Sequence, residues 1–202
     1  MKKTLLLLPV IAGLAFLTAA CAKPPTEAVD AAKAALSAAK AAEAAEYAPA
    51  SLSKAEEAVT VLETELKTQA DKFALMRSYT RALELAGAAK TAAEKAAADA
   101  ATGKEAAKNE ATTLIAGVKT AVEEVKTLIT TAPKGKGTQA DIEAMKADLA
   151  GVESGVVDLD STFDGGRYKE AKAKAEAAQQ TLDRIKADIQ AAIDAKKAAR
   201  GR

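Results

Sequence analysis

Alanine accounts for 54 of the 202 residues, and this feature limits what the chain can fold into more than any other. Alanine is the best helix former, and its small side chain lets helices approach closely while filling little interior volume. Aromatic residues make up only 3% of the chain. Because strands favour β-branched and aromatic residues, the composition argues against a β-sandwich or a barrel. We therefore expect an all-α protein built from slender, closely packed helices.

The residue types needed for several common kinds of site are missing from the sequence. There is no histidine, and Cys21 is the single cysteine. These absences argue against histidine-based acid–base catalysis, cysteine-rich zinc sites and an intrachain disulfide. A net charge of +1 gives no support to nucleic-acid binding. We expect no enzymatic activity, no cofactor, no metal and no small-molecule substrate.

The first twenty residues have the pattern of an export signal. Two lysines precede an apolar run at 5–17, and small residues follow this run up to Cys21. The run is shorter than the roughly 20 apolar residues of a membrane-spanning helix, but it suits a secretory signal peptide. We predict that residues 1–20 are a signal peptide and that residues 21–26 hold an anchored cysteine and a short spacer.

The end of this segment, Leu17-Thr18-Ala19-Ala20-Cys21, resembles the lipobox of bacterial lipoproteins, with Thr18 where leucine is more usual. The resemblance implies that the Cys21 sulfur receives a diacylglyceryl group, that cleavage makes Cys21 the first residue, and that its amine is then acylated. Several acyl chains would anchor the protein firmly, at ~0.8 kcal/mol per buried CH₂. Ala22 stands where an aspartate would resemble an inner-membrane retention signal. We therefore expect attachment to the outer membrane, facing the periplasm.

Proline, glycine and capping signals divide the remaining chain into six expected helices. Thr26 is placed to cap the first helix, and Ser53 with Glu56 has the spacing of a capping box in the second. Gly103 is expected to end the third helix, and the loop at 133–137 to end the fourth. The six helices are expected at about 27–47, 49–71, 73–101, 105–131, 138–163 and 167–199.

The apolar stripes of these helices repeat along the chain. The second and fifth helices match at an offset of ninety residues, from Leu52 with Ile142 to Phe73 with Phe163. The other helices match at an offset of eighty-nine, in the pairs Val29 with Val118, Ala32 with Ala121, Leu36 with Val125, Tyr79 with Tyr168, Ala82 with Ala171, Ala86 with Ala175, and Ala89 with Ala178. Chance register is the alternative, because such stripes are generic to helical bundles. The matched phenylalanines and tyrosines favour an internal duplication.

The repeat predicts two tandem three-helix units, each an antiparallel helical bundle, at residues 27–103 and 104–202. The third helices of the two units differ in the bulk of their stripe residues. Three alanines of the first unit correspond in the repeat to larger aliphatic residues of the second unit. The matched positions are Ala93 and Leu182, Ala96 and Ile185, and Ala100 and Ile189. Burial of a large aliphatic side chain contributes ~1.5–3 kcal/mol. We therefore expect the second unit to be the more stable one.

The first half of the chain resembles the domain-of-unknown-function family numbered 4398. The residues that carry the resemblance are Tyr47–Leu52, Ala55–Ala58 and Tyr79–Ala86, and it covers about residues 27–103. It implies a helical domain of a bacterial envelope lipoprotein, a class that sometimes carries an OmpA-like peptidoglycan-binding domain, and it transfers no catalytic residues. The second half departs from the pattern, because Pro133 is followed by a Gly-Lys loop instead of Ala-Ser-Leu.

Several polar clusters admit a functional interpretation beside a plainer one. The pairs Glu56-Glu57 and Glu123-Glu124 could form an acid–base pair, but solvated helix faces are favoured. Asp158 and Asp160 with Asp164-Gly165-Gly166 have some features of a calcium loop, but a corner between two helices is favoured because the EF-hand pattern is missing. Gly135 and Gly137 alternate with lysines, but the strand that precedes a phosphate loop is lacking, and a solvated loop is favoured.

The basic end of the chain, residues 196–202, could lie against anionic lipid or wall polymer. The plainer interpretation is a helix end whose cations suit the negative end of the helix dipole. For the whole protein we expect a membrane-anchored structural or scaffolding lipoprotein, with an envelope protein or peptidoglycan as possible partner. The alternative is a binding adaptor or carrier for a peptide, a lipid or a partner helix of an envelope complex.

Overall fold

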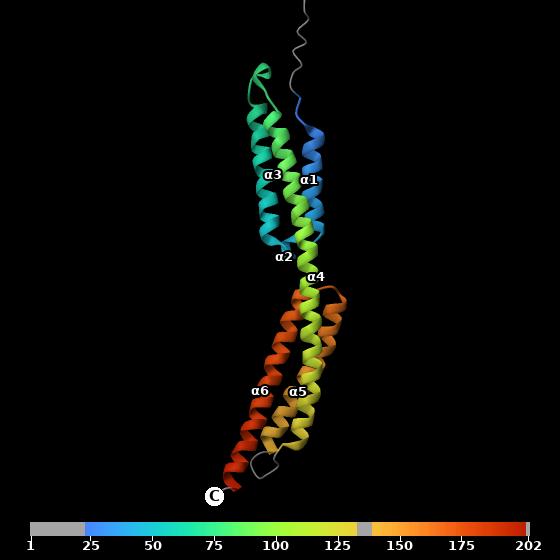
Figure 1. Ribbon diagram of the computed structural model, residues 1–202, viewed down its shortest axis with the longest axis vertical. Coiled ribbons are helices and arrows are strands. Elements are labelled where there is room, and N and C mark those ends of the chain that lie inside the picture. The colour runs from blue at the N-terminus through green and yellow to red at the C-terminus, as the bar shows by residue number, and fades with distance from the viewer. Residues whose placement is uncertain (1–22, 133–138, 201–202) are drawn as a thin grey trace, which may run out of the picture.

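The computed structural model describes residues 23–132 and 139–200, and over these ranges it contains helices, turns and no strand. The helices lie along one axis and form a long rod (Figure 1). Their bounds are α1 (Thr26–Ala41), α2 (Ala44–Tyr47), α3 (Pro49–Ala70), the 3-10 turn η1 (Ala74–Met76), α4 (Thr80–Thr131), α5 (Gln139–Asp164) and α6 (Tyr168–Arg200). The predicted all-α helical bundle is confirmed. None of the described helices combines the length and the apolar character needed to cross a bilayer.

One helix, α4, runs through both halves of the molecule. It has 52 residues, so it is about 78 Å long at 1.5 Å per residue. The predicted third and fourth helices are therefore one continuous helix, and the expectation that Gly103 ends a helix is wrong. A single glycine costs a helix interior only ~1 kcal/mol, which tertiary packing on both sides can outweigh.

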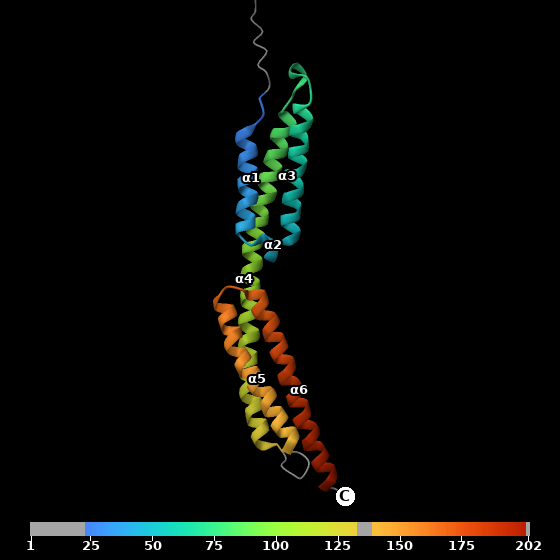
Figure 2. The same cartoon turned by 180° about the vertical axis from the view of Figure 1, so that it is seen from behind.

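Two three-helix bundles share α4. The three long helices of the first unit are α1, α3 and the first half of α4, with the single-turn helix α2 between α1 and α3, and those of the second unit are the second half of α4, α5 and α6 (Figure 2). The buried core divides on α4 between Ala107, which packs with the first unit, and Ala111, which packs with the second. The predicted boundary between 27–103 and 104–202 thus falls inside a helix that belongs to both units.

The buried residues follow the predicted stripes in both units. Ala93, Ala96 and Ala100 are fully buried in the first unit, and their counterparts Leu182, Ile185 and Ile189 are at most 1% exposed in the second. The interior of the first unit is therefore filled largely by methyl groups at these levels. The second unit has larger aliphatic side chains there.

Phe73 does not occupy the environment that the stripe predicts for it. Its side chain is 71% exposed. Its counterpart Phe163 is partly buried and lies against Tyr168, with 5.1 Å between the ring centroids. The difference arises because α3 ends at Ala70, so that Phe73 belongs to the loop before α4 and not to a helix.

Three predicted helix boundaries need correction. The first helix ends at Ala41 instead of near residue 47, because Glu43 has a left-handed backbone with φ of 59°. Thr26 is the first residue of α1 and makes no side-chain cap. Ser53 lies inside α3, which begins at Pro49 as its proline predicts, so there is no capping box at Ser53.

The turn predicted at Asp164-Gly165-Gly166 is confirmed, and its hydrogen bonds explain why α5 ends there. Gly166 has a left-handed φ of 76°. Its N–H donates to the Phe163 carbonyl at 2.9 Å, and the Arg167 N–H donates to the Thr162 carbonyl at 3.2 Å. This pair of bonds is the Schellman arrangement, in which glycine takes the left-handed position after a helix.

Candidate functional site

The main predicted site residue, Cys21, lies outside the described residues, as does the loop at 133–137 with its alternating glycines and lysines. The carboxylate pairs considered for acid–base chemistry lie on exposed helix faces. Glu56 pairs with Lys40 at 2.7 Å, and Glu124 pairs with Lys186 at 2.6 Å. Each of these carboxylates faces a lysine of a neighbouring helix, which is a bundle contact and not a catalytic arrangement.

The aspartates considered for a calcium loop also face cations. Asp158 Oδ2 lies 2.7 Å from Lys174 Nζ, and Asp160 Oδ2 lies 2.8 Å from Lys119 Nζ. The two carboxylates thus point to different helices, α6 and α4. Within the described ranges no group of three or more histidine, cysteine, aspartate or glutamate residues is arranged to hold a metal ion.

Ion pairs between helices run along the whole rod. Each joins one helix of a unit to a neighbour in the same unit. Among the described residues the pairs are Lys33 with Glu63, Lys40 with Glu56, Lys119 with Asp160, Lys126 with Glu153, Lys172 with Glu110, Lys174 with Asp158, Arg184 with Asp148, and Lys186 with Glu124. Exposed pairs of this kind contribute little to stability, because water screens the two charges. Their main effect is to select which faces of the helices meet, and their contribution to the free energy of folding is small.

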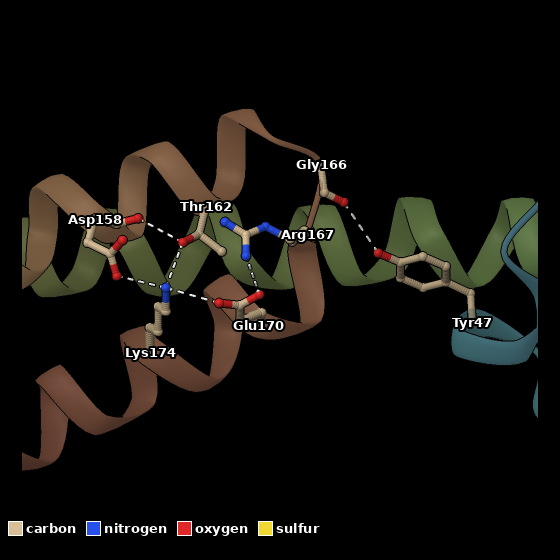
Figure 3. A network of polar contacts seen from close by, with 7 residues as sticks. All are labelled: Tyr47, Asp158, Thr162, Gly166, Arg167, Glu170 and Lys174. Atoms are coloured by element: carbon tan, nitrogen blue, oxygen red, sulfur yellow. Dashed lines mark hydrogen bonds and ion pairs between the residues drawn. The ribbon is translucent and has the colours of Figure 1, made fainter.

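A network of polar contacts joins α5 to α6 at the corner between them (Figure 3). Lys174 Nζ donates to Asp158 Oδ2 at 2.7 Å, to Thr162 Oγ1 at 2.8 Å and to Glu170 Oε1 at 3.0 Å. Arg167 Nη1 contacts the other oxygen of Glu170 at 2.9 Å. All three donors of the ammonium group are therefore used within one corner.

The pKa values follow from these contacts. The hydrogen bond from Lys174 lowers the pKa of Asp158 and the pKa of Glu170, and the same contacts raise the pKa of Lys174. Thr162 is fully buried and donates its hydroxyl to the Asp158 carbonyl at 2.8 Å. The network therefore fastens the last turns of α5 to the first turns of α6, and its role is structural.

Tyr47 joins the two units at the middle of the rod. Its hydroxyl donates to the Gly166 carbonyl at 3.4 Å, across the gap between α2 and the α5–α6 turn (Figure 3). The ring lies between two lysines, with Lys169 Nζ at 5.4 Å and Lys104 Nζ at 5.8 Å from its centroid. Lys169 also donates to the carbonyl of Glu46. These contacts bridge the units outside the shared helix.

The environment of Tyr47 keeps this bridge protonated. Burial raises the pKa of the Tyr47 phenol, so it remains a hydrogen-bond donor throughout the neutral range. The hydrogen bond from Lys104 to Glu43, with 2.8 Å between Nζ and Oε2, raises the pKa of that lysine. The junction is therefore a braced contact between the corners of the two units.

The hollows between the helices are shallow. One lies between the start of α1 and the start of α4 and is lined by Pro24, Pro25, Leu83 and Gly87 among others. Another lies between α5 and α6 beside Gly151 and Gly155. Both are open grooves over alanines, glycines and the stems of charged side chains. Neither brings together the polar groups that a catalytic site requires.

The sequence did not point to the exposed loop at 71–79, which joins α3 to α4 and which we call the tip. It carries Phe73, Leu75 and Met76, whose side chains are 71%, 71% and 73% exposed. One signal could have located it. The offset between the two copies changes from ninety to eighty-nine between Phe73 and Tyr79. The copies therefore differ in length at this loop.

Comparison with protein-family models, with curated proteins and with solved structures finds no match to this chain. The resemblance to family 4398 therefore stays a prediction.

Proposed function

We propose that this protein is a lipid-anchored structural or scaffolding lipoprotein of the bacterial cell envelope, most consistent with the outer membrane facing the periplasm. The observation that carries the proposal is the course of the chain. Thr26 begins α1 at one end of the rod, five residues after Cys21, and α6 ends at the other end (Figure 1). A lipid on Cys21 would therefore hold one end at the membrane and extend the other away from it.

The length of the rod supports a spacing role. The shared helix α4 alone covers about 78 Å. Paired charges are found along the surface of the rod, and the ion pairs between helices select which helix faces meet in each bundle. A rod of this kind presents a long helical surface at a set distance from its anchor. The exposed basic residues Lys196 and Lys197 lie near the distal end, where an envelope protein or an anionic wall polymer could be contacted.

The anchor is tested by mass spectrometry of the protein isolated from bacterial membranes. We expect a mature chain that begins at Cys21 and carries the mass of its acyl chains. Cys21→Ala should accumulate as the longer precursor. A mature chain without lipid, or one that begins at another residue, would refute the anchor.

The scaffolding role is tested by crosslinking in intact cells. A photoreactive residue at Lys197 is compared with one at Val157, which is 72% exposed on the side of the second unit. A scaffold that acts through its distal end should crosslink mainly from position 197. Stoichiometric purification with one membrane complex through a lateral face, with crosslinks mainly from position 157, would instead favour the adaptor or carrier function.

A further inference from the structure

The tip gathers exposed apolar side chains at one end of the rod. Within the described residues, the large apolar side chains with high exposure are Val61, Phe73, Leu75, Met76, Leu83 and Val157. Three of these six belong to the tip, and Leu83 lies in the first turn of α4 beside it. Single exposed apolar residues are ordinary on protein surfaces, but neighbouring ones that form a patch indicate a site of contact with another protein or with a membrane.

The tip is held in a defined conformation by polar contacts behind it. Gln69, which is only 6% exposed, accepts hydrogen bonds from the Ser78 N–H and from Lys72 Nζ, both at 3.1 Å. Arg77 donates to the carbonyls of Ala70 at 2.8 Å and Lys72 at 3.0 Å, and so satisfies the end of α3. The loop thus turns Phe73, Leu75 and Met76 outward while its own polar groups are bonded.

The corresponding loop of the second unit provides an internal comparison. There, Asp164-Gly165-Gly166 occupies the place that Ala74-Leu75-Met76 occupies in the tip, and Arg167 corresponds to Arg77. The second-unit loop faces the first unit at the braced junction, and Phe163 packs on Tyr168. Of these two corresponding loops, the polar one lies at the junction of the units and the apolar one lies at an end of the rod.

The tip lies at the end of the rod where the chain enters from Cys21. The start of α1 and the start of α4 line the same hollow, and η1 immediately precedes α4 (Figure 1). The segment 67–81 carries four cations, Lys67, Lys72, Arg77 and Arg81, and one carboxylate, Asp71. Arg81 pairs with Glu84 at 3.4 Å, so the surroundings of the tip keep an excess of two positive charges. Exposed apolar side chains with an excess of positive charge beside them are the pattern of a surface that enters the interface of a membrane with anionic lipid.

We propose that the tip is a second membrane contact, in which Phe73, Leu75 and Met76 enter the interfacial region and the surrounding cations lie at anionic phospholipid headgroups. This proposal rests on the proposed function for the side of the membrane that the tip meets. With a lipid at Cys21 and the tip beside it, the rod has two attachment points at one end. Two points restrict the tilt of the rod more than one point does.

The absence of tryptophan makes a direct test possible. Every contact described above lies within residues 23–200, so a chain that starts at Ala22 keeps the whole rod without a lipid. Phe73→Trp gives this chain a single indole at the tip. Val157→Trp is the matched control, because Val157 is equally exposed on the side of the second unit.

Vesicles of phosphatidylcholine and phosphatidylglycerol in equal parts should shift the emission of the Phe73→Trp protein to shorter wavelength, and brominated acyl chains should quench it. The Val157→Trp protein should show neither change. Combined Phe73→Ser, Leu75→Ser and Met76→Ser should weaken vesicle partitioning ~tenfold or more. Lys72→Gln should weaken it about fivefold on these vesicles and much less on pure phosphatidylcholine.

Three results would overturn the proposal: no spectral shift of the Phe73→Trp protein, an equal shift of both tryptophan variants, or a shift that needs only higher protein concentration and no vesicles, which indicates self-association. Circular dichroism establishes that each variant is folded. The mass of the mature protein tests the anchor separately. If the mature protein carries no lipid while the chain from Ala22 binds vesicles, the anchor is refuted and the tip contact is retained. If the mature protein carries the lipid while the chain from Ala22 does not bind vesicles, the tip contact is refuted and the anchor is retained.

Discussion

A Cβ atom placed on Gly103 would lie 2.5 Å from the carbonyl oxygen of Tyr47 and 3.3 Å from its Cβ atom. This approach brings α2 against the middle of α4 and places the Tyr47 ring at the junction of the two units. A glycine that resembles a helix terminator is instead the point at which a second segment of backbone touches a continuous helix.

Gly103→Ala should therefore lower the stability of the protein. The contact is with backbone, which cannot rotate away, and overpacking of this kind costs ~1–3 kcal/mol. Gly87→Ala and Gly117→Ala are matched controls on the same helix, because nothing lies within 4 Å of the added atom. Each control should raise the free energy of unfolding by up to ~1 kcal/mol through helix propensity. Urea denaturation measures all three, and a stabilising Gly103→Ala would show that α2 does not press on α4.

The fully buried aliphatic residues of α6 should contribute more stability than any single residue at the matched level of the first unit. Ile185→Ala removes a side chain that is 1% exposed and should cost ~2–5 kcal/mol. Val157→Ala, at a position that is 72% exposed, should change the free energy of unfolding by less than ~0.5 kcal/mol. Comparable losses for the two variants in denaturant unfolding would contradict the assigned core.

Because of the same difference in core bulk, the first unit should open more readily than the second. Native-state hydrogen exchange of the intact chain, followed by mass spectrometry, should show faster exchange in the middle of α1 and α3 than in the middle of α5 and α6. The comparison is made in one molecule under one condition, so differences in solvent and temperature are removed. Slower exchange in α3 than in α5 would contradict the stability order expected from the alanine-lined core.

The Lys174 corner should make a stabilising contribution that depends on pH. The pKa values of Asp158 and Glu170 are lowered in the folded state, so their contribution is present above the ordinary carboxyl pKa of about 4 and is lost as the pH falls through the lowered values. Lys174→Met should lower the melting temperature by a few degrees at neutral pH. The difference from the unaltered protein should shrink below about pH 4.

Lys90→Met is the control for this pH dependence. Its ammonium group lies 3.6 Å from Glu94 on the same helix and belongs to no such network. Its melting temperature should follow that of the unaltered protein across the acid range. A difference between Lys174→Met and the unaltered protein that stays constant through the acid range would show that the lysine acts by packing and not by charge.

Gln69→Leu should separate the order of the tip from the stability of the bundle. Leucine stands at the matched position of the second unit, Leu159, so the apolar side chain fits the stripe and global stability should be kept or raised. The Ser78 N–H loses its acceptor. Its amide should therefore exchange faster with solvent, which NMR can measure residue by residue. Unchanged protection at Ser78 would show that Gln69 does not order the loop.

The sequence predicts the helical class and the buried stripes well, because alanine content and three–four spacing act through local geometry. The burial of Ala96 and of its counterpart Ile185 follows directly from that spacing. Helix ends are harder to predict. Gly103 lies inside α4 where the backbone of Tyr47 approaches it closely, and this contact between distant segments has no local signal in the sequence. The end of α1 depends on a left-handed Glu43, a conformation that glutamate adopts rarely and that its sequence neighbours do not announce.

The tip shows the other limit of reasoning from a repeat. The match of Phe73 with Phe163 predicts equal environments, yet α3 ends at Ala70, before Phe73, whereas α5 continues to Asp164 and includes Phe163. One ring is therefore exposed and the other is packed. The sequence also predicts a helix over residues 73–79, because the residues there are compatible with one. In the structure these residues form a loop instead, in which Arg77 donates to the Ala70 carbonyl at the end of α3 and Gln69 accepts from the Ser78 N–H.

The number of long helices in each unit is odd, and this determines where a further copy of the unit would lie. A unit with an odd number of long passes, here α1, α3 and the first half of α4, delivers the chain to the end opposite its entry (Figure 1). An even number would return the chain to the end at which it entered, so that a further copy would lie beside the first one. With three passes and a shared helix, each further copy advances the distal end by about 39 Å, half the length of α4. Duplication of such a unit therefore lengthens the rod without changing its cross-section, and the number of copies sets the distance between its two ends.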